Sequence, residues 1–492
     1  MSYRSAMLAG AALIIASAAG CAVGPDFQPP QPPSVQGYTP EQLPASTASA
    51  ADPLGGAQHF DTGKDIEGAW WQLLHSPPLD ALVAQALKAN PTLASAQAAL
   101  RQARENVAAQ RGQYFPTVTA GLSASRNLTP IAALSPASAS GNPYYSLITP
   151  QLNVSFVPDV FGANRRTVES LEAQAANQQF QLEATYLTLT SNVVAAAVQE
   201  ASLRGQIAAN REIVKQETDL LVILRRQLDL GQVAGSDVAA QEAALAQAQQ
   251  ALPPLQKQLA QQRDLLTALA GRFPSQEIAE QFDLAGLQLP LDLPVSLPGK
   301  LIEQRPDVRA AEESMHSASA LIGVAVAARL PQITLSGTIG NSASTAASMF
   351  TPGTNFWTIA GGVTTPIFDF GTLLHKQRAA QAAFDQAAAQ YQSTVLTAFQ
   401  NVADALNAAV ASERAAARSL AIVRRQLDLG QVAYLALLNA QNTYQQTRVA
   451  LVLAEANRLA DTAALFQALG GGWWNRTDVA TASTQVEPDR PR

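Results

Sequence analysis

The sequence predicts an α+β membrane protein built as an internal two-fold repeat. A duplicated decapeptide, long stretches with a heptad period, and four short alternating segments support this prediction. The decapeptide RRQLDLGQVA occurs at residues 225–234 and again at 424–433. Ten identities over this separation indicate a duplication. Because glycine accepts the left-handed conformation that ends many helices, each copy is expected to form the tip of a helical hairpin.

The first twenty residues have the features of an export signal. Arg4 is followed by an apolar run that is too short to cross a membrane as a helix. The run ends in the sequence AAGC, which resembles the lipobox of bacterial lipoproteins. Cys21 is the only cysteine of the chain, so it has no disulfide partner and is predicted to be acylated. The alternative is signal cleavage nearby, with Cys21 as a bystander.

Residues 21–60 are rich in proline, which restricts the backbone and lacks an amide donor. We therefore predict an extended tether that is not packed against the rest of the protein. The folded part is expected to open at Trp70 and Trp71. Only 14% of the residues are charged and 6% are aromatic, which is typical of long helices packed through small side chains. The net charge of −6 argues against a nucleic-acid partner.

Four segments alternate apolar and small polar residues, two in each half of the chain. They lie at residues 117–124, 148–156, 333–339 and 357–364. Period two predicts strands, and about ten residues is the length of a tilted membrane-spanning strand. The alternative is a soluble antiparallel sheet. Since four strands cannot close a barrel alone, the membrane interpretation requires several chains.

Long helices are predicted between the strand pairs and the decapeptides. In the stretch 163–230, fourteen positions from Leu182 to Leu228 step alternately by four and three, and eleven of them are apolar or aromatic. This pattern is typical of a coiled-coil seam, and such a helix would be ~100 Å long. The stretch 372–429 is its counterpart, and the partner helices are expected at 236–270 and 435–469. Pro253 and Pro254 predict a kink in the first partner helix.

The predicted domain organisation follows from these elements. A signal at residues 1–20 and the tether at 21–60 precede a first repeat at 61–270. An irregular linker with little helix is expected at 271–298, a second repeat at 299–470 and a polar, disordered tail at 471–492.

Several motifs together resemble the outer-membrane efflux factors, in particular the NodT-type lipoprotein branch of the TolC-like channels. They are Cys21 with the following AVGPDF, the openings Asn90-Pro91 and Arg305-Pro306, the corners PDVFG at 158–162 and FDFG at 368–371, and the two tips. The resemblance covers residues 65–470 and implies a trimer. Each chain would give four strands to a twelve-stranded β-barrel, continued by a long α-helical coiled-coil periplasmic tunnel.

The resemblance also implies a function and partners. The protein would be a passive outer-membrane exit duct of a tripartite efflux system for drugs or toxic small molecules. It would be anchored in outer-membrane lipid and joined through a periplasmic adaptor, a membrane fusion protein, to an inner-membrane efflux pump. Two alternatives remain: the outer-membrane channel of a type I protein-secretion system, and a trimeric coiled-coil scaffold lipoprotein without a channel.

The hairpin tips are the predicted sites of adaptor contact. These sites are Leu230, Gly231, Gln232 and Val233 in the first copy and Leu429, Gly430, Gln431 and Val432 in the second. A trimer would present this one shape six times, which a symmetric adaptor ring could grip. The alternative is that both tips are only efficient helix stops.

Candidate gate residues lie close to the tips. They are Asp229, Asp237, Asp428, Tyr434, Leu435 and Asn439. Rings of like carboxylates attract cations and repel one another, so they can tune selectivity and opening. The family resemblance implies a carboxylate in a sequence like LLDAQ where this chain has Asn439, and it matches Leu435 to a gate leucine. The alternative is that the aspartates are solvated helix ends.

The sequence favours neither catalysis nor metal binding. The four histidines show no ligand spacing, and no G-x-S-x-G nucleophile motif or nucleotide-binding motif is present. We therefore predict no enzyme activity, no catalytic residue, no metal site and no cofactor.

Overall fold

The computed structural model describes residues 22–476 except 36, 42, 48–53, 55, 129–143 and 428–433, and it describes no side chains from 411 to 445. The chain divides into two compact units. Unit 1 contains Met1–Pro30, Leu100–Asn177 and Ala311–Gln390, and unit 2 contains Gln31–Ala99, Gln178–Ala310 and Tyr391–Arg492. Each unit takes parts of both predicted repeats, so the two copies of the repeat do not form separate compact units.

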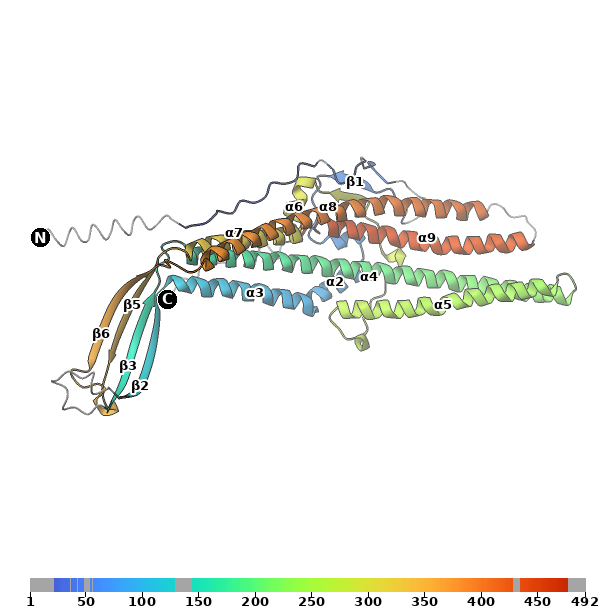
Figure 1. Ribbon diagram of the computed structural model, residues 1–492. Coiled ribbons are helices and arrows are strands. Elements are labelled where there is room, and N and C mark those ends of the chain that lie inside the picture. The colour runs from blue at the N-terminus through green and yellow to red at the C-terminus, as the bar shows by residue number, and fades with distance from the viewer. Residues whose placement is uncertain are drawn as a thin grey trace. The chain divides into compact units, whose positions relative to one another are not determined.

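Unit 1 is built on a four-stranded antiparallel sheet (Figure 1). Its strands are β2 (Thr117–Leu128), β3 (Tyr144–Phe156), β5 (Gln332–Asn341) and β6 (Asn355–Thr364), in the order β2-β3-β5-β6. The pairing of β3 with β5 joins the two halves of the chain in one sheet. All four strands predicted from alternation are confirmed.

Prolines set the boundaries between helices and strands. Helix α3 (Pro91–Arg111) and helix α7 (Pro306–Ala327) both start at a proline, whose missing amide is tolerated at the first helical position. Both helices end shortly before a second proline, Pro116 or Pro331, after which the chain becomes extended. Short 3₁₀ turns lie at Gly112–Tyr114 and Ala346–Ser348.

The predicted hairpins are present as long helices. Helix α4 (Ala163–Asp229) is followed by α5 (Gly235–Leu269), and α8 (Thr372–Leu427) by α9 (Tyr434–Ala468). Helix α5 is assigned as one helix through Pro253 and Pro254. In the described helices, no stretch combines the length and apolarity needed to span a membrane.

Unit 2 has a compact core beside its hairpins. Trp70 of the 3₁₀ helix η1 (Trp70–Leu74) stacks on Phe466 with ring centroids 5.3 Å apart. Buried leucines of α2 (Pro77–Ala89) and of α6 (Pro298–Gln304) belong to the same unit. In the linker at 271–298, the 3₁₀ turns η5 (Pro274–Gln276) and η6 (Leu284–Gly286) precede β4 (Asp292–Val295). The sequence missed β4 and its parallel partner β1 (His59–Thr62).

The expectation of an unpacked tether is wrong for the described part of residues 21–60. The Tyr38 hydroxyl donates to the carbonyl of Ser296 at 2.8 Å, and Thr47 is buried. The Arg458 guanidinium donates to the carbonyls of Leu54 and Gly56. Proline keeps the backbone extended, but the polar and aromatic residues between the prolines supply the contacts. The folded part therefore opens before Trp70.

The predicted tail also begins later than expected. Residues 473–475 form the 3₁₀ helix η8 (Trp473–Asn475), and the Trp473 indole donates to the carbonyl of Gln304 at 2.7 Å. Arg476 forms an ion pair with the buried Glu183 at 2.8 Å. Long-range partners thus order residues 471–476, while 477–492 lie outside the described residues.

Candidate functional site: strands, hairpin tip and helix starts

The strand register collects the apolar side chains on one face of the sheet. Val118 lies opposite Val154, Leu152 opposite Ile339, and Ile339 opposite Trp357. The other face carries small polar residues, with Thr119 opposite Asn153, and the Thr338 hydroxyl donating to the Asn153 amide oxygen at 3.1 Å. The predicted two-faced sheet is confirmed.

The apolar face is open in a single chain. Leu122 is 70% exposed, Ile359 81% and Val363 69%. Soluble monomers rarely leave an apolar surface of this kind uncovered. The face therefore requires an apolar environment or a partner.

The sheet has two unsatisfied edges. Strands β2 and β6 each pair on one side only within the described chain, and because all neighbours are antiparallel, β2 and β6 run in opposite directions. Long open edges are templates for pairing with another chain. An edge β6 of one copy can thus continue antiparallel into β2 of the next.

At the first hairpin tip, helix α4 ends in a fully hydrogen-bonded C-terminal cap. Gly231 adopts a φ of 70°, and its amide donates to the carbonyl of Leu228 at 2.9 Å. The amide of Gln232 donates to the carbonyl of Gln227 at 2.8 Å. These two bonds define a Schellman motif, which satisfies the last carbonyls of α4. The motif leaves Leu230 65% exposed beside it.

The two first-tip aspartates have different surroundings. The Asp237 carboxylate accepts a hydrogen bond from the backbone amide of Ala234 at 3.1 Å, which caps the start of α5. Asp229 is exposed in the last turn of α4. Val233 packs against the buried cluster of Leu221, Leu224 and Val238. The tip is therefore fastened on the α5 side and open at Leu230.

The second tip is only partly described. Asp428, Leu429, Gly430, Gln431 and Val432 lie outside the described residues. Helix α9 starts at Tyr434 and includes Leu435 and Asn439, whose side chains are not described. Cys21 also lies outside the described residues.

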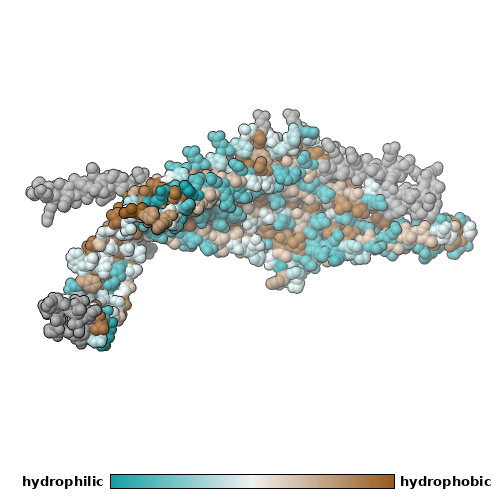
Figure 2. Space-filling model, viewed as in Figure 1, coloured by the Kyte–Doolittle hydropathy of each residue, from teal (hydrophilic) through white to brown (hydrophobic). Residues whose placement is uncertain are grey.

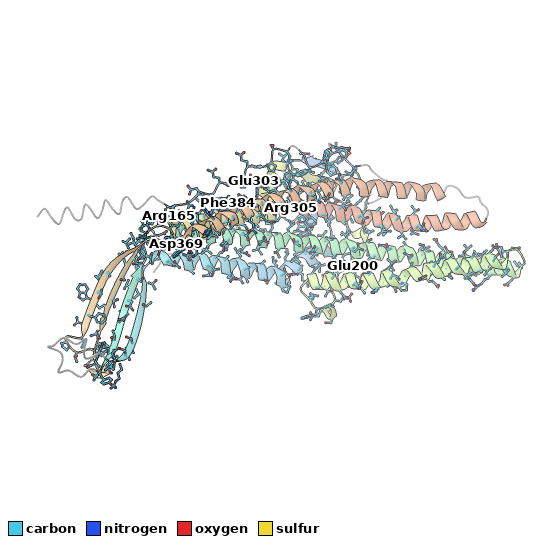
Figure 3. The ribbon with its side chains drawn as sticks, in the orientation of Figure 1. Arg165, Glu200, Glu303, Arg305, Asp369 and Phe384 are labelled. Carbon is cyan, nitrogen blue, oxygen red and sulfur yellow. The ribbon has the colours of Figure 1, made fainter. Side chains whose placement is uncertain are left out.

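The three polar positions of the heptad seam in α4 are buried and paired. Glu200 is fully buried, and its Oε1 accepts from Arg204 Nε and Arg263 Nη1, each at 2.8 Å (Figure 3 labels Glu200). Asn210 donates to the carbonyl of Gln206 at 2.9 Å. The buried Gln241 donates to both the carboxylate and the carbonyl of Glu217. Polar groups at seam positions fix helix register.

At each aromatic-glycine corner an aspartate caps the helix that follows, but the two caps use different backbone amides. At the first corner, the Asp159 carboxylate accepts from the amides of Asn164 and Arg165 at 2.9 and 2.8 Å. At the second, Asp369 accepts from the amides of Gly371 and Leu373 at 3.0 and 2.8 Å (labelled in Figure 3). The amide of Leu373 is the main reason that the pKa of Asp369 is lowered.

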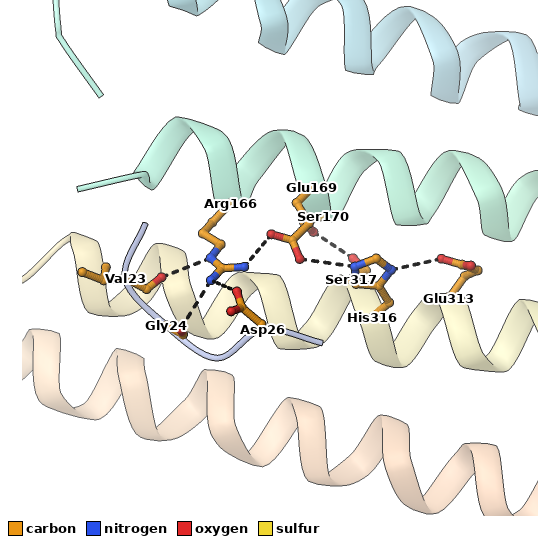
Figure 4. Close-up of polar contacts among 9 residues, drawn as sticks. All are labelled: Val23, Gly24, Asp26, Arg166, Glu169, Ser170, Glu313, His316 and Ser317. Atoms are coloured by element: carbon orange, nitrogen blue, oxygen red, sulfur yellow. Dashed lines mark hydrogen bonds and ion pairs between the residues drawn. The ribbon is translucent and has the colours of Figure 1, made fainter. Parts of the chain in front are cut away.

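Residues 22–27 form a strap, which is held on unit 1 by one arginine (Figure 4). The buried Arg166 donates to the carbonyls of Val23 and Gly24 and pairs with Asp26 and Glu169, each at 2.7 Å. Burial acts to lower the pKa of Arg166, but the two carboxylates outweigh it and raise the pKa. Three contacts from one side chain, to Val23, Gly24 and Asp26, thus fix the strap.

Close backbone approach and stacking complete the strap. Gly24 has a φ of 100°, and a Cβ there would lie 2.4 Å from the Cα of Gly323. Phe27 stacks on His316 at 4.4 Å, and His316 lies between Glu169 and Glu313. Among the described residues, no group of three or more His, Cys, Asp or Glu side chains could hold a metal ion.

Comparison with known proteins identifies the family. The model of the outer membrane efflux protein family matches residues 82–272 and 297–471. The chain belongs to the outer membrane efflux proteins. The family assignment and the fold expected from the sequence motifs are thereby confirmed.

Curated relatives of this family cover nearly the whole chain. The probable efflux pump outer membrane protein TtgC of Pseudomonas putida is 29% identical over 95% of this chain and 96% of its own length. The outer membrane protein OprJ of Pseudomonas aeruginosa is 27% identical over 94% and 95%. The efflux pump relatives support an efflux function and an outer-membrane location.

Solved outer-membrane channels share the fold. The channel OprN has a TM-score of 0.78 and 26% identity over 92% of this chain and 100% of its own. The open state of MtrE from Neisseria gonorrhoeae has a TM-score of 0.74 and 25% identity over 93% and 100%. This outer membrane efflux protein therefore has the fold of a membrane channel.

Sequence reasoning missed the capping role of both corners and the strap. In the sequence, the corners PDVFG and FDFG indicate only the family resemblance, although an aspartate a few residues before a helix is also a capping signal. The AVGPDF run was recognised as a motif, and the structure places it against α4 and α7. Nothing local in the sequence names Arg166 or Gly323 as its partners.

Proposed function

We propose that three copies of this chain form a passive outer-membrane exit duct for small toxic compounds. The observation that carries the proposal is the sheet of unit 1, with one exposed apolar face, one polar face and two open antiparallel edges. Joining β6 of each copy to β2 of the next removes every edge and gives a closed barrel of twelve strands, four from each copy. The apolar face contacts lipid, and the polar face lines water.

The proposed partners are a periplasmic adaptor and an inner-membrane pump. Relatives named antibiotic efflux, toluene efflux and pyoverdine export outer membrane proteins support an export role with varied cargo. We propose drugs or toxic organic molecules as the cargo of this chain. The polar strand face of Thr, Ser, Asn and Gln supports a duct with little selectivity of its own, so the pump supplies specificity and energy.

The hairpin tips are the proposed adaptor contact. Leu230 is exposed beside the rigid Schellman turn of Gly231, so it offers an apolar knob in a fixed position. The duplicated decapeptide supports the same shape at Leu429 and Gly430. Among the gate candidates, Asp237 acts as a helix cap, which favours Asp229 and the α9 residues Tyr434, Leu435 and Asn439 for the gate.

Acylation of Cys21 is proposed as the lipid anchor. The strap supports it, because Val23 is bound through its amide to the carbonyl of Phe161 at 3.1 Å and through its carbonyl to Arg166. The acylated residue would thus start two positions from a fixed point on unit 1. Mass spectrometry of the mature protein tests this step, with Cys21→Ala as the unmodified control.

Planar-bilayer conductance tests the duct itself. The purified trimer is expected to give stable conductance steps, and Cys21→Ala is expected to conduct as well, because the anchor is separate from the pore. Leu122→Lys on the apolar face should suppress insertion, whereas Thr119→Lys on the polar face should insert and shift ion selectivity toward anions. A protein that stays soluble without detergent and never inserts would overturn the proposal.

A further inference from the structure

The second aromatic-glycine corner, FDFG at 368–371, is an exposed apolar surface that the proposed duct does not use. Ile367, Phe368 and Phe370 are each at least 76% exposed. Phe370 also has a φ of 54°, a backbone conformation that bulky residues rarely adopt. The structure thus holds large apolar side chains outward at the point where β6 gives way to helix α8.

The first corner, PDVFG at 158–162, shows what lies beside such a corner. It follows β3, and β3 pairs with β5 through Phe156 opposite Leu335. A groove of about 230 Å³ is bounded by this corner and by the start of β5, residues 331–333. A corner therefore lies beside the beginning of the strand that pairs with the strand before it.

The internal repeat makes the start of β2 the counterpart of the start of β5. Helices α3 and α7 are followed at the same spacing by Pro116 and Pro331, and a strand begins after each proline. Strand β6 pairs on one side only within the described chain, and the proposed barrel joins it to β2 of the next copy. The second corner of one copy is then expected to lie beside Tyr114, Phe115 and Pro116 of the next.

The two edges can meet at the required end of the sheet. Strand β2 begins at Thr117 and β6 ends at Thr364, and both lie where the sheet joins the helices (Figure 1). Val118 and Val363 are both exposed on the apolar face, so antiparallel pairing of the two edges can keep that face continuous. Phe115 is itself 71% exposed, so the start of β2 also lacks a cover in a single chain.

We propose that Phe368 and Phe370 of one copy pack against Tyr114 and Phe115 of the next, as an aromatic contact between copies. The cover of the second corner is a neighbouring copy and not lipid, because pairing of β6 with β2 brings the start of β2 beside this corner, as pairing of β3 with β5 does within the chain. Buried aromatic rings contribute strongly to protein interfaces. The inference rests on the proposed function, since it requires the trimer.

Disulfide trapping tests the contact. Cys21 is the only cysteine, so Cys21→Ala gives a cysteine-free chain to which Phe115→Cys and Phe370→Cys are added. Within one chain these positions follow opposite edges of the four-stranded sheet, about 14 Å apart for three strand spacings. A disulfide allows about 7 Å between Cα atoms, so the bond must join two copies.

The double-cysteine protein, purified in detergent and mildly oxidised, should run as covalent dimer and trimer on a denaturing gel. Each single-cysteine variant should run as a monomer. The matched control combines Phe370→Cys with Tyr145→Cys, because Tyr145 is also exposed but lies opposite Asn127, at the other end of the sheet. This control should give no covalent species.

Two outcomes overturn the proposal and are distinguishable. A trimer that conducts in bilayers but gives no covalent species with Phe115→Cys and Phe370→Cys would retain the duct and leave the corner to lipid. A protein that is monomeric in detergent would overturn the contact and the proposed function together.

Alanine variants give a second measurement of the same contact. Phe115→Ala and Phe370→Ala should each lower the temperature at which the trimer dissociates on heating in detergent. The double variant should lower it by clearly less than the sum of the two single shifts, because each change removes the same contact. Additive shifts would show that the two rings do not touch.

Discussion

The two helix caps of unit 1 belong to corresponding parts of the repeat but have different surroundings. Asp159 and Asp369 each accept two backbone amides at the start of the following helix, α4 or α8, although the amides differ in position. Glycines with positive φ follow at Gly162 and Gly371. Only the first corner is covered by the strap, through the contact of Ala22 with Gly162. Both corners retain an aspartate cap, which is a local feature. The contact with the strap is a long-range feature and belongs to the first corner.

The second corner is correspondingly bare. Ile367 is 93% exposed and Phe370 89%, and the Phe370 ring packs at a tilt against Phe368 with ring centroids 4.5 Å apart. Figure 2 shows hydrophobic side chains gathered where the strands of unit 1 meet its helices. Girdles of aromatic residues flank the lipid-facing band of outer-membrane barrels. The uncovered corner is thus suited to the lipid boundary or to a neighbouring copy.

Replacing Arg166, which holds the strap, should lower the stability of the protein more than the other changes considered. Arg166→Ala deletes a buried cation and leaves Glu169 and two carbonyls without their donor. We expect a loss of about 3 kcal/mol in stability. Thermal unfolding in detergent measures the loss, and proteolysis within residues 22–30 reports release of the strap. The control Arg165→Ala, on an exposed neighbour, should stay within about 0.5 kcal/mol of the unchanged protein.

Alanine at the paired glycines gives the sharpest comparison. Both Gly162→Ala and Gly371→Ala place a Cβ on a backbone with positive φ, which costs about 1 kcal/mol. At Gly162 the Cβ would also lie 2.8 Å from the Cα of Ala22, whereas at Gly371 the nearest atom is a His375 ring carbon at 3.5 Å. Gly162→Ala should therefore lower the thermal midpoint more. Equal thermal midpoints of the two variants would show that the strap adds nothing to the cost of a Cβ at the first corner.

The two capping aspartates are expected to contribute similar amounts to stability. Asp159→Ala removes two hydrogen bonds from the start of α4 and is expected to cost about 1 kcal/mol. Asp369→Ala should act in the same direction but more weakly, because in the described structure the strap packs on the first corner and adds contacts there. Circular dichroism during thermal unfolding measures both. A larger effect at Asp369 would contradict the view that the strap stabilises the first corner.

The smallest expected effect is a pH dependence at Asp369. Its folded-state pKa is below the ordinary value of 3.8, so its contribution to stability is present above that value and is lost as pH falls through the folded pKa. The difference in thermal midpoint between the unchanged protein and Asp369→Ala should therefore be constant near neutral pH and shrink below about pH 4. A difference that grows on acidification would refute this sign.

The elements were predictable because their signals are local and periodic. Alternation located all four strands, and the predicted helical stretch 163–230 matches α4 to within one residue. The heptad positions also include Glu200, Asn210 and Glu217, which stand out in the sequence only because they are polar among apolar residues. The roles of Glu200 and Glu217 depend on Arg263 and Gln241 of α5, and no local pattern encodes that pairing.

The predictions for the strap and for the start of the tail were wrong for related physical reasons. Proline content in the strap and polar composition in the tail predict the character of the backbone, but they do not identify its distant contacts. The close approach of Gly24 to Gly323 and the bond from Trp474 to Asp65 join residues hundreds of positions apart. The sequence predicts Asp237 as a gate residue, but in the structure its carboxylate caps the start of α5.

The buried pair of Glu217 and Gln241 constrains how the first hairpin can move. Sliding α5 along α4 by one helical turn would separate the carboxylate from its donor and leave it buried, at a cost of about 1–3 kcal/mol or more. The neighbouring cluster of Leu221, Leu224 and Val238 would lose its contacts at the same time. The end of the hairpin therefore moves as one rigid body, so that a displacement of Leu230 moves α4 and α5 together.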